Sequence, residues 1–109
     1  MTYSKAAAFT SEEQQLAALA KALSHPARIA IIKLLARQKT CISGDIANDL
    51  PLSRTTVSQH LQELKAIGLI KGEIDGLKVC YCLNPDFMKQ VKAQFEALFS
   101  LAIESCDCC

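Results

Sequence analysis

The strongest constraint on the fold comes from two short strand-like segments that are separated by an Asp-Gly pair. Leu69–Ile74 and Lys78–Leu83 carry β-branched and aromatic residues, and Asp75-Gly76 lies between them. Asp-Gly is a strong signal for a tight hairpin turn, because both residues tolerate the positive φ angles that the turn requires. The sequence therefore predicts an antiparallel β-hairpin in the second half of this chain of 109 residues.

Two amphipathic helices and a short strand are predicted near the N-terminus. Thr10 or Ser11 begins the first helix, with Glu13 placed for a capping box, and Pro26 begins the second because proline suits a first helical turn. The segment 40–42 is short and β-branched, which favours a brief strand. The inner faces of the two helices are expected to carry Leu16, Leu19, Ala20, Leu23, Ile29, Ile32, Leu35 and Ala36.

Two further helices precede the hairpin and one follows it. Ser43 or Gly44 opens a short helix, and Ser53 caps a longer one that ends before Gly68. The last helix begins near Asn84. The expected inward residues of the first two of these helices are Ile46, Ala47, Leu50, Val57, Leu61 and Leu64. The last helix is expected to carry on one face Phe87 or Met88, Val91, Phe95, Leu98 and Ala102.

The resulting order is helix, helix, short strand, helix, helix, hairpin, helix. Two helices joined by a tight turn and followed by a hairpin predict a winged helix-turn-helix, a mainly α fold with a small β-hairpin (α+β). We expect a single domain over residues 1–109, with an N-terminal arm at 1–9 and a cysteine-rich tail at 104–109. The first and last helices keep apolar stripes that one small domain cannot cover, so we expect a homodimer through these helices.

Composition narrows the class of protein. Twelve basic against eleven acidic residues give a net charge of +1, which excludes a strongly basic nucleic-acid tail but not a local basic patch. Met1 to Phe9 lacks the apolar stretch of a signal peptide, and no segment approaches a membrane span, so we expect a cytoplasmic chain with no membrane partner. Without a P-loop, paired carboxylates or triad spacing, an enzyme is not expected.

The helix after Ser53 separates cleanly by face, with apolar residues inward and short hydrogen-bonding side chains plus one arginine outward. Such groups read base edges in the major groove: arginine reads guanine, glutamine reads adenine and the threonine methyl group contacts thymine. The expected base readers are Arg54, Thr55, Ser58, Gln59 and Gln62. The residues expected to reach phosphates are Thr56, His60, Lys65, Lys71 and Lys78.

Two simpler interpretations of these residues stay open. The polar outer face of an isolated helix is usually only solvated, but its place between a tight turn and a hairpin favours DNA. His60 by itself is more typical of a structural histidine than of a phosphate contact.

Two motifs of this chain resemble the ArsR/SmtB family of bacterial metal- and metalloid-responsive repressors. They are L-S-H-P-A-R at 23–28 and L-S-R-T-T-V-S-Q-H-L at 52–61, and the hairpin at 68–83 fits the same pattern. The resemblance covers roughly residues 16–99. It implies a homodimer that binds an imperfect palindrome of double-stranded operator DNA and leaves the DNA when an inducer binds.

The resemblance also implies inducer sites, and this chain departs from two of them. Zinc-type members carry Asp and His ligands on the last helix, but here Asp86 to Glu104 contains no histidine. That zinc or cobalt site is therefore not expected. Other members carry a Cys-x-Cys pair at the third helix, where this chain has Cys41-Ile42-Ser43, so a serine replaces the second thiol.

Six cysteines in a cytoplasmic chain are more typical of metal ligands or redox thiols than of disulfides. Strand alternation turns the apolar residues of 78–83 toward the core, so Cys80 and Cys82 share the opposite face. If the short strand pairs with the second hairpin strand, Cys41 lies beside them. Three thiolates suit a soft ion, with As(III) or Sb(III) as the expected inducer and Cd, Pb or Bi as competitors.

Cys106, Cys108 and Cys109 form a second cluster. They are expected to be a second three-thiol site or an arm that completes the strand site, in the same subunit or across the dimer. Three alternatives stay open for the cysteines. They could be small half-buried hydrophobic residues, the thiols of a redox or persulfide-sensing repressor of the same fold, or part of a metal-buffering or protein-interaction domain.

Overall fold

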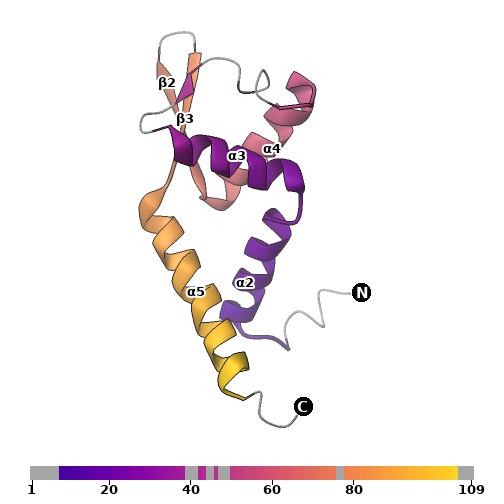
Figure 1. Ribbon diagram of the computed structural model, residues 1–109, viewed down its shortest axis with the longest axis vertical. Coiled ribbons are helices and arrows are strands. Elements are labelled where there is room, and N and C mark those ends of the chain that lie inside the picture. The colour runs from indigo at the N-terminus through magenta and orange to yellow at the C-terminus, as the bar shows by residue number, and fades with distance from the viewer. Residues whose placement is uncertain (1–7, 39–41, 44–45, 47–49, 76–77, 106–109) are drawn as a thin grey trace.

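The computed structural model describes residues 8–38, 42–43, 46, 50–75 and 78–105, of which 42–43, 73–75 and 78–79 are described by their backbone (Figure 1). The elements are α2 (Ser11–Ala22), α3 (Pro26–Arg37), β1 (Ile42–Ser43), α4 (Arg54–Ile67), β2 (Ile70–Asp75), β3 (Lys78–Leu83) and α5 (Pro85–Glu104). This order confirms the predicted winged helix-turn-helix, in which α4 is the second helix of the motif and the β2–β3 hairpin is the wing.

Several predictions lie outside the described residues. They are the N-terminal arm up to residue 7, most of the short helix at 44–50, the Gly76 turn of the hairpin, and Cys41 with the tail cysteines. Of that short helix, Ile46 is buried and Leu50 packs against the core, as expected. The assignment of the whole chain to one domain stays a prediction.

Local sequence explains where the helices begin. Thr10 Oγ1 accepts the backbone N–H of Glu13 at 3.1 Å, and a Glu13 carboxylate oxygen accepts the N–H of Thr10 at 2.9 Å, which is the predicted capping box. Pro26 occupies the first turn of α3. Ser53 Oγ accepts the N–H of Thr56 at 3.2 Å and so caps α4.

The junction between α4, the wing and α5 is fixed by two residues. Gly68 ends α4 with φ at +97°, in the left-handed region that side chains disfavour. The Asn84 amide donates to the Gly68 carbonyl at 3.0 Å, while its Oδ1 accepts the N–H of Phe87 at 3.4 Å and caps α5. The end of α4 is thereby tied to the start of α5.

We expect Gly68→Ala to lower the free energy of unfolding by about 1–2 kcal/mol, because the added Cβ is strained at positive φ. The strain is the cause rather than a clash, since that Cβ would meet the Phe87 ring at 3.5 Å, an ordinary contact. Urea denaturation measures the difference. Gly68→Asn is the matched control and should lose less, because asparagine tolerates the left-handed conformation. Equal losses for both variants would contradict this explanation.

The three strands form one antiparallel sheet in the order β1-β3-β2. Ile42 pairs with Tyr81 and Ser43 with Cys80, which confirms that the short strand pairs with the second hairpin strand. Tyr81 and Leu83 pack against the core, as the alternation predicts. Cys80 and Cys82 therefore belong to the other face of β3.

A single cluster of buried side chains joins the helices to the sheet. Its members are Leu19, Ile31, Leu35, Ile46, Val57, Leu61, Leu64, Leu69, Ile70 and Val91. The inward face predicted for α4 is confirmed. The faces predicted for the first two helices were partly wrong: Ala20, Ile29 and Ala36 are exposed, whereas Ala22 and Ile31 are buried. α2 packs on α4 and α5, whereas α3 packs on α4 and β3. These neighbours decide which side of each of the two helices is buried.

The molecule has two distinct ends. The wing and the N-terminal end of α4 lie at one end, and α2 and α5 extend toward the other (Figure 1). Over the described residues, no helix is long and apolar enough to cross a membrane.

Candidate nucleic-acid interface and thiol site

The geometry of α4 sorts its polar residues into three rows. Successive helical residues are about 100° apart, and Val57, Leu61 and Leu64 define the inward direction. The row that points most directly outward is Thr55, Gln59 and Gln62. The flanking rows are Arg54, Ser58 and Lys65 on one side, and Thr56, His60 and Glu63 on the other.

All five predicted base-reading residues are exposed on α4. The N-terminal end of α4 lies at the same end of the molecule as the wing, so both elements can meet one face of a duplex (Figure 1). A major groove about 12 Å wide admits one helix, and the flanking phosphates then lie within reach of the wing. The base contacts themselves stay a prediction.

The residues predicted to contact phosphate have different surroundings. Lys65 is exposed, and its side chain lies against Gly72 of β2. A Cβ added at Gly72 would be 3.3 Å from Lys65 Nζ. Lys71 is exposed on β2, and Lys78 begins β3, where its backbone pairs with Asp75. Thr56 is half-buried, and its Oγ1 accepts the Ser53 hydroxyl at 3.0 Å.

His60 is held from the side of α3. Arg28 Nε donates to His60 Nδ1 at 3.0 Å, and Arg28 Nη1 donates to the Ala22 carbonyl at 3.1 Å. His25 lies beside it, with 5.4 Å between the ring centroids. Because Nδ1 accepts a hydrogen bond, the neutral ring carries its proton on Nε2. These contacts give His60 a structural role, and a phosphate contact through Nε2 stays a prediction.

The environment of His60 disfavours its protonated form. Burial lowers the pKa of His60 below its ordinary 6.5, and the charges of Arg28 and His25 lower it further. Protonation of Nδ1 would also break the hydrogen bond from Arg28. Arg28 lies in one of the two sequence motifs, but the sequence alone predicts no role for it, because the contact spans 32 residues of chain.

We expect the free energy of unfolding to fall as the pH drops below about 6.5, because the unfolded chain then binds a proton that the folded chain resists. Above that pH the full contribution of His60 to the free energy of unfolding is present, since the ring is then neutral in both the folded and the unfolded chain. Urea denaturation between about pH 5 and 8 measures the slope. His60→Gln, whose side-chain oxygen can still accept from Arg28, should flatten it. An unchanged slope in this variant would assign the effect to other groups.

Cys80 and Cys82 are both half-buried on the same face of β3. Their neighbours across the sheet are Ser43 and Glu73 for Cys80, and Lys71 for Cys82. Cys41 directly precedes β1 but lies outside the described residues, as do Cys106, Cys108 and Cys109. Within the part of the chain that is described, no three His, Cys, Asp or Glu side chains form a group that could hold a metal. The three-thiolate site therefore stays a prediction.

Comparison with known proteins identifies the helix-turn-helix segment. Residues 25–71 match the family described as "Bacterial regulatory protein, arsR family". The chain is 32% identical over 83 residues to the HTH-type transcriptional regulator Rv2034 of Mycobacterium tuberculosis, covering 76% of this chain and 77% of that protein.

Solved structures have the same fold. An ArsR-like transcriptional regulator from Rhodococcus sp. RHA1 superposes with a TM-score of 0.71 at 23% identity, over 88% of this chain and 90% of that one. A second structure is the winged helix-turn-helix domain of Mb0332 from Mycobacterium bovis, described as homodimeric and as a possible ArsR-family regulator. It superposes with a TM-score of 0.61 at 29% identity, over 86% of this chain and 83% of that one.

The family match holds most of the two motifs, and the fold matches extend over 86–88% of the chain. They assign the protein to DNA-binding transcriptional regulators and not to enzymes. The chain therefore belongs to the ArsR family of bacterial transcriptional regulators.

Proposed function

We propose that this regulator is a dimeric repressor that leaves its operator when a thiophilic ion binds its cysteine thiolates. As(III) or Sb(III) is the proposed inducer, with Cd, Pb and Bi as competitors. The observation that carries the proposal is the position of Cys80 and Cys82, which are half-buried together on one face of β3. The same strand pairs with β1, which begins one residue after Cys41.

The chemistry of the donor set supports a soft ion. Thiolates select soft metals and metalloids, and trivalent arsenic accepts three sulfur ligands. We propose Cys41, Cys80 and Cys82 as these ligands, with Cys106, Cys108 and Cys109 as a second set or as an arm that completes the first. The strand site takes no ligand from the last helix, which lacks histidine.

The proposed coupling runs through the sheet. β1 pairs with β3, and β3 pairs with β2 to form the wing. An ion that draws the thiolate of Cys41, next to β1, toward those of β3 would shift the wing relative to α4 and so weaken its contacts with phosphates. A coupling free energy of about 1–3 kcal/mol is typical and corresponds to roughly 5–150-fold in operator affinity.

The test is a titration of arsenite into a complex of reduced protein and labelled operator DNA, followed by fluorescence anisotropy. Operator affinity should fall by roughly 5–150-fold. Cys80→Ser or Cys82→Ser should abolish this response and leave DNA binding without arsenite intact. A variant with serine at all three tail cysteines is compared with these two strand variants. Unchanged affinity in the presence of arsenite would refute metalloid sensing, and loss of response only in the tail variant would refute the strand site.

The same experiment separates ligation from redox sensing. A thiol redox or persulfide sensor would release DNA upon oxidation and would show a covalent link between cysteines by mass spectrometry. A bound metalloid with reduced thiols supports the proposal. A protein that binds no operator DNA at all would instead favour a metal-buffering or interaction domain.

A further inference from the structure

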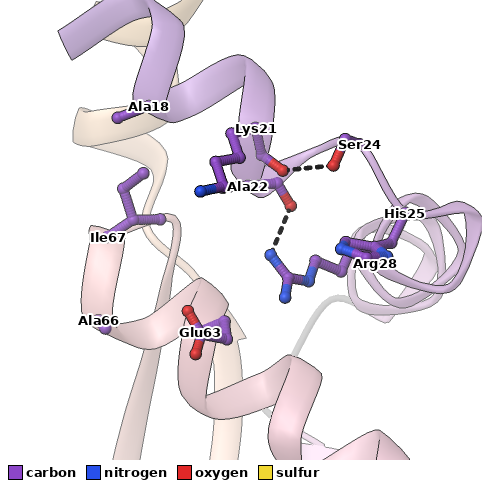
Figure 2. A pocket seen from close by; sticks show the side chains of 9 residues that line it. All are labelled: Ala18, Lys21, Ala22, Ser24, His25, Arg28, Glu63, Ala66 and Ile67. Atoms are coloured by element: carbon purple, nitrogen blue, oxygen red, sulfur yellow. Dashed lines mark hydrogen bonds between the residues drawn. The ribbon is translucent and has the colours of Figure 1, made fainter. Parts of the chain in front are cut away.

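An open pocket of about 570 Å³ lies where α2, the turn after it and the second half of α4 meet (Figure 2). Ala18, Ala22 and Ile67 give it an aliphatic wall. Its volume falls within the range of about 300–1,000 Å³ that is typical of small-molecule sites. It shares no residue with the proposed thiol site or with the outward row of α4.

Arg28 brings a half-buried positive charge to this pocket. Two of its guanidinium nitrogens are used by the ring of His60 and the carbonyl of Ala22, and neither partner is an anion. Among the residues that the structure describes, no carboxylate oxygen lies within 4.0 Å of the guanidinium. A half-buried guanidinium without a carboxylate partner favours binding of an external anion.

The other charged groups of the pocket come from two facing helices. Lys21 of α2 and Glu63 of α4 border the same opening as Arg28 (Figure 2). Over the described part of the chain, neither forms an ion pair within 4.0 Å. The pocket is therefore bordered by the two cations Arg28 and Lys21 and by the carboxylate of Glu63, and it also has an aliphatic wall.

We propose that this pocket binds a small amino-carboxylate, such as a free aliphatic amino acid. The ligand carboxylate binds Arg28 and Lys21, its ammonium group binds Glu63, and its aliphatic part lies on Ala22 and Ile67. A simple anion such as phosphate fits less well, because the Glu63 carboxylate would repel it. This proposal goes beyond the proposed function and requires neither a thiophilic ion nor DNA.

The position of the pocket gives the ligand a way to affect DNA binding. α2 is one of the two helices of the proposed dimer interface, and α4 carries the proposed base readers. A ligand that bridges α2 and α4 would favour one relative orientation of these helices, so its binding and operator binding would be linked.

The test is an NMR titration of the full reduced protein, without DNA, using L-leucine as the probe. Acetate carries only the carboxylate group of leucine, and methylammonium carries only its ammonium group. Inorganic phosphate is an anion that lacks an ammonium group. Leucine should shift the resonances of Ala22 and Ile67 saturably, with an affinity about tenfold or more above that of each half. No shift with leucine, or equal binding of acetate or phosphate, would overturn the proposal.

A matched pair of variants checks the site. Glu63→Gln should weaken leucine binding about tenfold, because it removes the charge that faces the ammonium group. Glu12→Gln, an exposed change in the first turn of α2, should leave binding unchanged. If both variants bind leucine like the parent, or if the pocket resonances move with protein concentration instead, the pocket is not an amino-carboxylate site.

Discussion

Replacing Gln59 by alanine is expected to lower affinity for the specific operator by about 1–3 kcal/mol, or roughly 5–150-fold. Gln59 is exposed in the outward row of α4, where its amide can form two hydrogen bonds with an adenine edge. Affinity for random-sequence DNA should barely change, because base contacts specify the sequence and phosphate contacts supply most non-specific affinity.

Lys71→Ala tests a phosphate contact, in contrast to the base contact that Gln59→Ala removes. Lys71 is exposed on β2 of the wing, where its ammonium group is expected to contact phosphate. Its loss should weaken binding to specific and random DNA alike, and should reduce the slope of log affinity against log salt by about one. Fluorescence anisotropy on both DNAs at several salt concentrations separates the two behaviours.

Gln90→Ala is the control for replacing an exposed glutamine by alanine, since Gln90 is exposed on α5, outside both α4 and the wing. Should Gln59→Ala weaken random and specific DNA equally, Gln59 contacts the backbone and the assignment of base readers is wrong. A Lys71→Ala variant with an unchanged salt slope would place the wing away from the phosphates.

The sequence predicted the elements best where local chemistry fixes them. The capping residues Thr10, Ser53 and Asn84 begin their helices as expected, and Gly68 ends α4. Each such signal acts within a few residues, so it can be read without knowing the tertiary structure. The paired strands followed equally from their β-branched and aromatic residues and from the Asp75-Gly76 pair between them.

The faces of α2 and α3 could not be predicted as well, because the alanines of α2, and the alanine, isoleucine and leucine residues of α3, occur on several sides of the helix. In such helices the pattern is nearly the same on several sides, and the element that covers the helix decides which stripe is buried. α4 carries polar residues on its outer side, so Val57, Leu61 and Leu64 were identified without ambiguity.

Contacts between distant segments were beyond the reach of sequence reasoning. The hydrogen bond from Arg28 to His60 and the pocket beside it join α2, α3 and α4, and no local pattern encodes that meeting. The proposed thiol site is intermediate: alternation along β3 places Cys80 and Cys82 on one face, whereas the proposed further ligands come from other segments of the chain.

The combined change of Leu98→Glu and Leu101→Glu is expected to convert the proposed dimer into a monomer and to lower affinity for a two-site operator by about 10²-fold or more. Leu98 is 46% exposed and Leu101 65% exposed near the end of α5, where the core of one chain no longer covers them. Phe99 and Ile103 are also exposed near the end of α5, but on another side of the helix. In a dimer the side of α5 that carries Leu98 and Leu101 would be buried, and two carboxylates there would be desolvated without partners.

The loss of DNA affinity should reach or exceed the upper end of the range for a single base contact, because a monomer binds each half-site independently and loses the benefit of linked binding. The fold should persist, since both leucines are exposed in the single chain and lie outside the buried cluster. Light scattering measures the mass, and circular dichroism checks the helical content. Lys89→Glu, exposed on the same helix, adds comparable negative charge and should leave the dimer intact. If the double variant remains a dimer with normal operator affinity, α5 does not form the interface, and the exposed apolar end of α5 must serve another contact.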